Sequence, residues 1–505
     1  MNAITPDERA AGVLLHPTSL PGPHGIGDIG PAAHAWIDLL AESGTQLWQI
    51  LPLGPTGYAD SPYQCFSSFA GSPNLIAPDG LIAEGLVDAA EVGGASSPGR
   101  AVDYGVVIAQ KQAMLGSAYT RFAGGGASHL RAGLAEFRER NELWLEDFAL
   151  FMAVKEAHGG GPWTDWPRAI RLREEASVRA ATRQHAERFE RWIFIQYIFD
   201  RQWSQLHAHA ADRGVRIVGD LPLYVAPDSA DVWSRPDLFL LDEEGRAAVV
   251  AGVPPDYFST TGQLWGNPIY DWPRHAEEGY EWWSHRLGRT LHLVDIVRLD
   301  HFRGLADYWE IPAGSPTAES GRWLPGPGMQ FFDAIRSALG ETFIIAEDLG
   351  VPSPATRELL AAADLPGMRI LQFAFDGDHT NNFLPHRYPR RTVAYTGTHD
   401  NDTTLGWWRT APETEVAFAA TYLATEEADP VAAFLDSLWA SQAMFVLAPL
   451  QDLLRLGSEA RMNVPATTSG NWQWRALADE ISEALVDQLA ALNRVHRRSP
   501  PAPAS

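Results

Sequence analysis

Eight short apolar runs are spread along this 505-residue chain, and they restrict its fold more than any other feature. Several of them end in a polar or acidic residue, and helix-forming stretches without internal proline lie between many of them, for example 32–43, 331–339 and 356–363. Continuous apolar runs are typical of parallel strands that are buried on both faces. The runs are residues 12–16, 46–51, 215–220, 296–300, 343–347, 369–373, 393–397 and 444–448.

Eight strands with helical crossovers predict an α/β fold of the (β/α)8, or TIM barrel, type. A doubly wound open sheet is the alternative, but no glycine-rich phosphate loop follows the first run. The second and third runs are too far apart for an ordinary crossover, and 141–158 and 187–210 have helical patterns within that gap. We therefore expect a large, mostly helical insertion between the second and third strands, lying over the barrel mouth. The predicted division is a barrel of 10–55 and 212–495, an insertion of 56–211 and a disordered tail of 496–505.

Charge and cysteine content limit the possible partners and location. With 63 acidic and 39 basic residues the net charge is −24, which disfavours nucleic acid and anionic membrane surfaces as partners. Cys65 is the single cysteine, so an intrachain disulfide and a four-cysteine zinc site are excluded. The sequence has no secretory signal pattern at Met1–Arg9 and no apolar window of about 18 residues that could span a membrane. We expect a cytoplasmic protein.

Carboxylates stand at the ends of four of the eight runs. Barrel enzymes carry their catalytic residues at the C-terminal ends of the strands. A single acid at such a place could equally be a helix N-cap or a solvated loop residue, but four of them on one face favour an active site. The four residues are Asp220, Asp300, Glu347 and Asp400.

Asp300 and Glu347 form the most specific pair. Arg298 and Asp300 are two residues apart on one strand, so their side chains point to the same side, where the cation keeps Asp300 ionised as a nucleophile requires. Glu347 ends the next strand, and adjacent strands are about 4.8 Å apart. The two carboxyl groups are therefore expected at the separation of about 5–5.5 Å that retaining glycosidases have. Asp348 is expected to point away, in a loop or packing role.

Three histidines, His16, His301 and His399, also stand at strand ends. A metal site is one interpretation, but no His-x-x-x-His pair is present and the acids are not spaced as ligands. Hydrogen bonding to neutral hydroxyl groups is the better interpretation for at least two of them. Asp402 precedes a Thr-Thr-Leu stretch and is expected to be a helix N-cap.

Several long motifs make the sequence similar to a known family. Among them are HPTSLPG at 16–22, RLDHFRG at 298–304, AEDLG at 346–350 and YTGTHDNDT at 395–403. Further matches are 60–64, 219–222, 252–259 and 262–268. The chain resembles the 4-α-glucanotransferases, also called amylomaltases or disproportionating enzymes, which form family 77 of the glycoside hydrolases in the α-amylase clan. The resemblance extends from about residue 16 to about residue 475.

The resemblance implies a role for each of the residues that match. Asp300 would be the nucleophile, Glu347 the general acid/base and Asp400 the stabiliser of the transition state. Segment 263–267 would be a mobile loop over the substrate, with Trp265 as a stacking face. The implied substrate-binding residues are Tyr63, Asp220, Gln263, Trp265, Asn267, Arg298, His301 and His399.

The implied activity is the transfer of α-1,4-glucan segments, from starch, glycogen or maltooligosaccharides, by a retaining double displacement without cofactor or metal. A hydrolase of the same clan would share the three acids, whereas a non-catalytic glucan-binding protein would be expected to lack at least one. One departure is Ala466, where the family usually has glycine; if that glycine has a positive φ in relatives, the local turn is expected to differ here. Preferred chain length, cyclic products and oligomeric state are left open.

Overall fold

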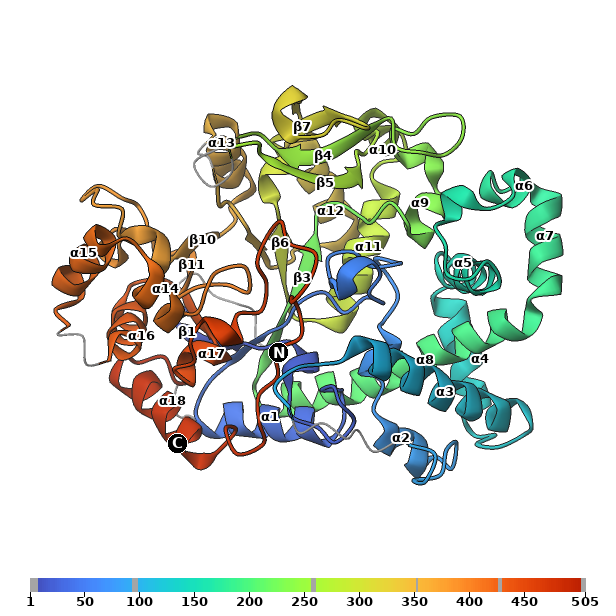
Figure 1. Cartoon of the computed structure of the whole chain (residues 1–505), viewed down its shortest axis with the longest axis horizontal. Coiled ribbons are helices and arrows are strands. Elements are labelled where there is room, and N and C mark those ends of the chain that lie inside the picture. The colour runs from blue at the N-terminus through green and yellow to red at the C-terminus, as the bar shows by residue number, and fades with distance from the viewer. Residues whose placement is uncertain (1–7, 93–98, 256–259, 351–352, 426–428, 501–505) are drawn as a thin grey trace.

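The structure, a computed structural model, describes residues 8–92, 99–255, 260–350, 353–425 and 429–500. Within these residues, eight parallel strands close into a barrel in the order β1-β12-β11-β10-β9-β6-β3-β2 (Figure 1). Each strand overlaps one of the predicted runs, which confirms the TIM barrel and excludes the open sheet. The strands are β1 Ala10–Leu14, β2 Leu47–Gln49, β3 Arg216–Pro222, β6 Ile296–Asp300, β9 Ile344–Ala346, β10 Gly367–Ile370, β11 Thr392–Tyr395 and β12 Phe445–Pro449.

The barrel interior is a packed apolar core to which every barrel strand contributes. Its buried residues include Ala10, Leu47, Val218, Ile296, Ile345, Met368, Val393 and Phe445. Because alternate residues of a strand share a side, an inward Ile296 directs Arg298 and Asp300 inward too, and Val218 does the same for Asp220. The core therefore determines which polar side chains reach the mouth of the barrel.

Helices cover the outside of the barrel, and α1, α12 and α13 coincide with the predicted helical stretches. Pro31 and Pro354 stand in the first turn of α1 and α13, where a missing N–H costs nothing, and Ser353 caps α13 by accepting from Thr356 N–H. In the described part of the chain, no helix combines the length and apolarity needed to cross a bilayer. The covering helices are α1 Pro31–Glu42, α11 Glu281–Leu293, α12 Met329–Leu339, α13 Pro354–Ala363, α16 Pro430–Ala440 and α18 Glu483–Val495.

The connection between β2 and β3 forms a group of helices at the right of Figure 1. The two predicted helical patterns correspond to α5 (Leu145–Ala157) and α8 (Ala186–Asp212). The remaining helices of this connection are α2 Pro78–Ala83, α3 Tyr104–Ala123, α4 Leu130–Arg140, α6 Arg168–Arg171 and α7 Glu175–Gln184.

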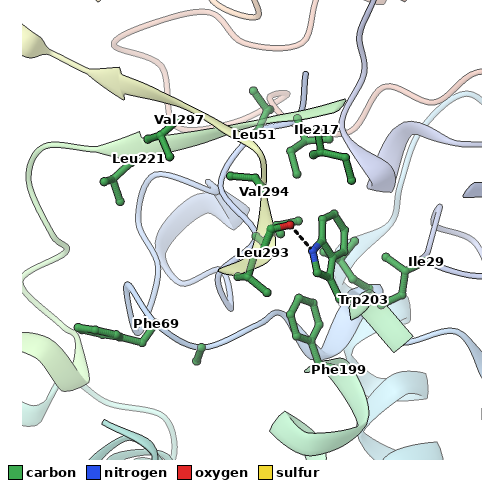
Figure 2. Close-up of a cluster of buried hydrophobic side chains, with 14 of the residues drawn as sticks. Ile29, Leu51, Phe69, Phe199, Trp203, Ile217, Leu221, Leu293, Val294 and Val297 are labelled. Atoms are coloured by element: carbon green, nitrogen blue, oxygen red, sulfur yellow. Dashed lines mark hydrogen bonds between the residues drawn. The ribbon is translucent and has the colours of Figure 1, made fainter. Parts of the chain in front are cut away.

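Helix α8 joins this group to the barrel. In its first half, Phe194 stacks on Phe122 of α3 with ring centroids 4.8 Å apart. In its second half, the Trp203 Nε1–H donates to the carbonyl oxygen of Leu293, 2.7 Å away, within an apolar cluster against the barrel (Figure 2). The predicted domain boundary at residue 211 coincides with the end of α8, although the second half of this helix already packs against the barrel.

A second sheet was not predicted from the sequence. Four antiparallel strands of the described chain pair in the order β5-β4-β7-β8, near the top of Figure 1. Segment 263–267, expected to be a loop, is part of strand β5; residues 256–259 lie outside the described residues. Strands β5, β7 and β8 include polar or charged residues and are only partly buried, so they lack the continuous apolar signal of barrel strands. Strand β4, Val-Val-Ala-Gly-Val, is apolar, but its run is not among the eight that the prediction used. They are β4 Val249–Val253, β5 Gln263–Pro268, β7 Asp307–Pro312 and β8 Arg322–Pro325.

The predicted tail begins too early. Arg498 is fully buried, and its guanidinium donates to the carbonyl oxygens of Trp439, Ser441 and Ala443 at 2.8, 2.9 and 3.0 Å. These carbonyl groups lie at the end of α16 and in the segment before the last barrel strand, and they need donors once they are buried. Arg498 therefore anchors this segment, although Arg497, Ser499 and Pro500 are exposed; residues 501–505 lie outside the described residues.

Candidate active site

Strands β6 and β9 place two carboxyl groups side by side at the mouth of the barrel. Leu299 pairs with Ala346 in the parallel register, so Asp300 and Glu347 follow at the same height on neighbouring strands. The Glu347 N–H donates to the Leu299 carbonyl at 3.0 Å, which fixes that register beyond the last strand residue. Asp400 reaches the same mouth from the loop after β11.

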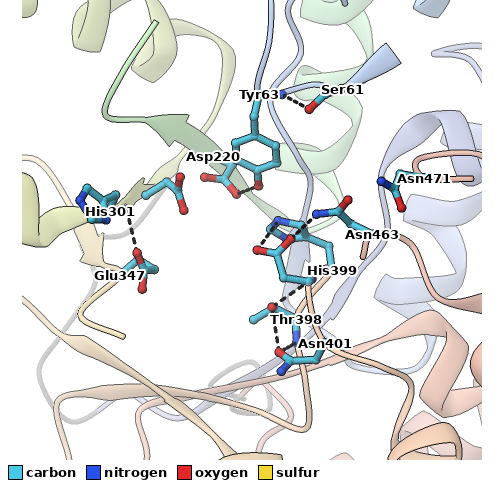
Figure 3. A network of polar contacts seen from close by, with 12 residues as sticks. Ser61, Tyr63, Asp220, His301, Glu347, Thr398, His399, Asn401, Asn463 and Asn471 are labelled. Carbon is cyan, nitrogen blue, oxygen red and sulfur yellow. Dashed lines mark hydrogen bonds and ion pairs between the residues drawn. The ribbon is translucent and has the colours of Figure 1, made fainter. Parts of the chain in front are cut away.

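Glu347 is held by backbone amides. Its Oε2 accepts from the N–H of His301 at 2.8 Å (Figure 3). Its Oε1 accepts from the N–H of Leu349, also at 2.8 Å. His301 has φ +52°, a left-handed conformation that is uncommon for a non-glycine residue, and this conformation accompanies the contact to Glu347. Burial, and then the charge of Asp300, raise the pKa of Glu347 to about 8, although Arg298 and the two amides lower it. The carboxyl group is therefore protonated at neutral pH, as a general acid must be.

Arg298 connects the nucleophile candidate to a buried aspartate. Its guanidinium lies 2.9 Å from Asp300 Oδ1 and 2.7 Å from Asp220 Oδ2. The Tyr63 hydroxyl also donates to Asp220 Oδ2, at 2.7 Å. This confirms that Arg298 and Asp300 share a side of the strand, and it gives Asp300 a fixed cation.

Asp400 is held as an anion at the other side of the mouth. The Asn463 Nδ2–H donates to Asp400 Oδ1 at 2.6 Å, and His399 Nε2 lies 3.3 Å from Oδ2. Burial raises the pKa of Asp400, but His399 and Asn463 outweigh it and hold the pKa well below its usual range. Burial lowers the pKa of His399, but Asp400 raises it above its usual value. Asp400 therefore lies at the cleft as a carboxylate, and the His399 imidazole beside it can act as a hydrogen-bond donor.

The other two histidines are neutral. Burial lowers the pKa of His301 to about 4 and that of His16 to about 3. His16 Nδ1 accepts from the Leu51 N–H at 3.2 Å, so this histidine supports the backbone after β2. In the described residues, no three His, Cys, Asp or Glu side chains are placed to hold a metal ion. Imidazole groups in these states can hydrogen-bond to neutral hydroxyl groups.

Comparison with known proteins identifies the family. A model of the 4-alpha-glucanotransferases, glycoside hydrolase family 77, matches residues 15–479. The chain belongs to this family. It is therefore a glycosyltransferase-type enzyme, and neither the hydrolase nor the non-catalytic alternative is favoured.

Individual relatives agree with the family match. A 4-alpha-glucanotransferase of Thermus thermophilus is 50% identical, over 97% of this chain and 99% of its own length. A chloroplastic/amyloplastic 4-alpha-glucanotransferase of Solanum tuberosum is 41% identical, over 93% of this chain and 82% of its own length. The solved structure of amylomaltase from Streptococcus agalactiae in complex with acarbose has a TM-score of 0.95 at 38% identity, covering 98% of this chain and 100% of that one.

Strand β5 places the remaining predicted substrate residues of this 4-alpha-glucanotransferase family member. Trp265 is half-buried, its ring stands edge-on to His301 with centroids 4.7 Å apart, and its Nε1–H donates to Gln263 Oε1 at 3.2 Å. Asn267 differs from them because it is buried and its Nδ2–H donates to the Val225 carbonyl at 2.8 Å. The structure thus brings Trp265 and Gln263 to the His301 side of the site, while Asn267 holds β5 to the segment after β3.

Some residues of the site were not predicted. Asn463 binds Asp400, and the Trp472 ring lies 5.7 Å from Tyr63 and 5.9 Å from His399. Both belong to a long loop far from any strand end, so the barrel pattern gives no signal for them. Tyr224, whose ring lies 6.1 Å from His301, follows β3 closely and could have been found by extending the strand-end rule by a few residues.

Two other aspartates near the motifs take structural places. Asp348 accepts from the Met368 N–H at 2.7 Å, which confirms its packing role. Asp402 is not the N-cap of α14 (Thr404–Thr410), because Thr403 caps that helix. Asp402 instead accepts from Thr403 N–H at 2.8 Å and from the Ser458 hydroxyl at 2.7 Å. Asp402 and Thr403 are adjacent and both are of a residue type that caps helices, so the sequence alone does not separate them.

Ala466, the departure from the family pattern, has φ +64°. A left-handed residue is therefore retained at this place although it is not glycine, and the chain accepts the strain of a Cβ atom there. Asn463, which binds Asp400, belongs to the same loop.

Proposed function

We propose that this protein moves α-1,4-glucan segments from a donor to an acceptor glucan through a covalent glycosyl-enzyme ester on Asp300. One observation carries the proposal: neighbouring strands present a carboxylate beside Arg298 and a carboxyl group whose pKa is raised to about 8. Two adjacent carboxyl groups in different surroundings can supply both the nucleophile and the acid of a retaining mechanism.

In the first step Asp300 attacks the anomeric carbon of the donor, and the glycosidic C–O bond breaks. Glu347 gives its proton to the leaving oxygen, which releases the reducing-end piece. In the second step ionised Glu347 takes the proton of an acceptor 4-hydroxyl group, whose oxygen attacks the same carbon and displaces Asp300. Two inversions give net retention.

The other polar residues bind the donor sugar. Asp400 accepts hydrogen bonds from its ring hydroxyl groups, and these strengthen as positive charge develops on the sugar ring. In the described chain, His399 Nδ1 is buried without a partner, which leaves it for a sugar hydroxyl group. Tyr63, Asp220, Arg298 and His301 complete this donor subsite, and Gln263 and Trp265 contact the acceptor side, with Asn267 positioning β5. The substrates are α-1,4-glucans and maltooligosaccharides, and this chemistry requires no cofactor.

The product pattern from pure maltotriose tests the proposal. Transfer produces glucose and a ladder of longer maltooligosaccharides, with almost no rise in reducing ends because each broken bond is remade. Asp300→Asn should abolish both products. If reducing ends rise in step with maltotriose consumption and no longer products form, the protein is a hydrolase and the proposal is wrong.

We also infer a cytoplasmic location and retain the division into a barrel and an insertion. A single cysteine suits a reducing compartment, and the strongly negative charge suits a protein without nucleic acid or membrane partners. Cell fractionation checks the location.

The division of the chain is supported by helices α2 to α7, which belong to the insertion of 56–211, although α8 continues into the barrel wall.

A further inference from the structure

A buried aspartate outside the catalytic set holds the loop that carries Asp400. Asp452 lies on α17 (Leu450–Leu453), directly after barrel strand β12, and is 1% exposed. Its Oδ2 accepts from the Thr396 hydroxyl at 2.5 Å and from the Thr404 hydroxyl at 2.7 Å. Its Oδ1 accepts from the Thr404 N–H at 2.6 Å.

Those donors stand at the two ends of one loop. Thr396 directly follows β11, and Thr404 begins α14. Loop 397–403, between them, contains both His399 and Asp400. One carboxylate therefore fastens the start and the end of the segment that presents these two side chains to the cleft.

The rest of the loop is held from other elements. The Gln372 Nε2–H donates to the Asp402 carbonyl at 2.8 Å, and the Arg461 guanidinium donates to the Asp400 carbonyl at 2.6 Å. Asn401 Oδ1 accepts from the N–H and the hydroxyl of Thr398, at 2.9 and 3.0 Å. These bonds fix the middle of the loop, whereas Asp452 fixes its ends.

A buried carboxylate bonded to neutral groups is not favourable for stability alone. Burial raises the pKa of Asp452, although its hydrogen bonds lower it. Hydrogen bonds from hydroxyl and amide groups do not fully offset the desolvation of such a charge, and an apolar contact of similar shape can serve stability equally well. The hydrogen bonds of Asp452 to both loop ends are directional, so they fix the positions of Thr396 and Thr404, which an apolar contact would not do.

We propose that Asp452 is a positioning residue for the transfer reaction: by tying Thr396 to Thr404 it keeps Asp400 and His399 where they can stabilise the transition state. The inference rests on the proposed function in one respect, the role of Asp400. A displacement of about 1 Å at such a group lowers turnover by about 100-fold.

The test compares Asp452→Asn with wild type, using α-maltosyl fluoride as donor and glucose as acceptor. Fluoride is a good leaving group and needs little help from the acid Glu347. The rate of fluoride release therefore depends mainly on the nucleophile and the donor subsite. We expect kcat to fall about 10- to 100-fold with KM changed no more than about threefold, because Asp400 acts mainly in the transition state. The milder variant Thr396→Val, which removes one donor, should give a smaller loss of the same kind.

A double-mutant comparison separates positioning from general damage. In an Asp400→Asn background the same Asp452→Asn change should lower the rate of fluoride release by less than about threefold, since the group it positions is already altered. Asp200→Asn is the matched control: Asp200 is buried on α8 and bound to Arg289 at 2.6 Å, so its loss should lower the melting temperature without lowering kcat.

Two results would overturn the inference. One is a kcat for Asp452→Asn within about twofold of wild type. The other is that Asp452→Asn lowers the rate of fluoride release by the same factor in the Asp400→Asn background as in wild type. Failure of the proposed function gives a different result, because wild type would then release fluoride without making longer sugars. The ratio of the fluoride-release rates of Asp452→Asn and wild type would still measure the effect of Asp452.

Discussion

Asp300 and Glu347 leave neighbouring strands at the same height, yet their surroundings differ. Asp300 has the Arg298 guanidinium at 2.9 Å, whereas Glu347 is bound by amides and lies beside a negative charge. The barrel register makes the two residues neighbours. Burial and the charge of Asp300 raise the pKa of Glu347, although Arg298 and the two amides, one of them from His301, lower it. The assignment of roles is therefore a local property of a few side chains.

The pH dependence of kcat/KM checks this assignment. Glu347 must be protonated to act as the acid, so the protonated fraction and the rate should fall above pH 8, with the limb near its pKa of about 8. The limb should remain in Asp348→Asn, because Asp348 binds β10 and not the site. A decline that is complete below pH 6 would contradict the pKa and its cause.

Trapping the ester separates the two carboxyl groups by role. In Glu347→Gln the nucleophile remains, so a glycosyl fluoride should still form the ester, which accumulates because no base activates the acceptor. Asp300→Asn should form no adduct with any donor. Intact-protein mass spectrometry distinguishes the variants, and an adduct on Asp300→Asn would refute its role as nucleophile.

At the level of elements, the sequence predicts those parts whose signal is continuous. Buried parallel strands leave apolar runs, so all eight barrel strands could be found, and the inward side of β6 followed from the spacing of Arg298 and Asp300. Three strands of the second sheet could not be found in this way, since β5, β7 and β8 are partly exposed and include polar or charged residues. Strand β4 is an apolar run, but its sequence does not indicate that it belongs to a separate antiparallel sheet. Asn463 was missed because a long loop brings it to Asp400 through tertiary contacts alone.

The loop of Asn463 also contains a strained residue that can be relieved. Ala466 has φ +64°, a conformation that costs an L-residue with a Cβ atom about 1 kcal/mol more than glycine. Ala466→Gly should therefore raise the free energy of unfolding by about 0.5–1 kcal/mol, measured by denaturant titration. Ala460→Gly is the control, since Ala460 is buried in the 3-10 helix Ser458–Ala460 and its loss should destabilise. Equal destabilisation by both changes would show that the positive φ carries no strain.

At the scale of the whole molecule, the barrel carries the proposed catalytic residues, and the second sheet carries Trp265, which lies beside them. Water is the most concentrated nucleophile present, so transfer requires that the acceptor hydroxyl group be held in place and water be kept from the ester. Positioning alone can give an effective molarity on the order of 10⁵ M. The second sheet lies in the connections on either side of β6, and it brings Trp265 to within 4.7 Å of the His301 ring.

Trp265→Ala tests whether this second sheet decides between transfer and hydrolysis. The change removes an aromatic face beside the acceptor side but leaves Asp300, Glu347 and Asp400 untouched. Transfer should therefore fall more than hydrolysis, and reducing ends from maltotriose should rise relative to longer products. Leu264→Ala is the matched control, because Leu264 is the adjacent residue of β5, points to the opposite face of the sheet and is 42% exposed. It should leave the ratio of products unchanged. If Trp265→Ala lowers both reactions equally, Trp265 supports the site as a whole, and the selection against water must come from elsewhere in the cleft.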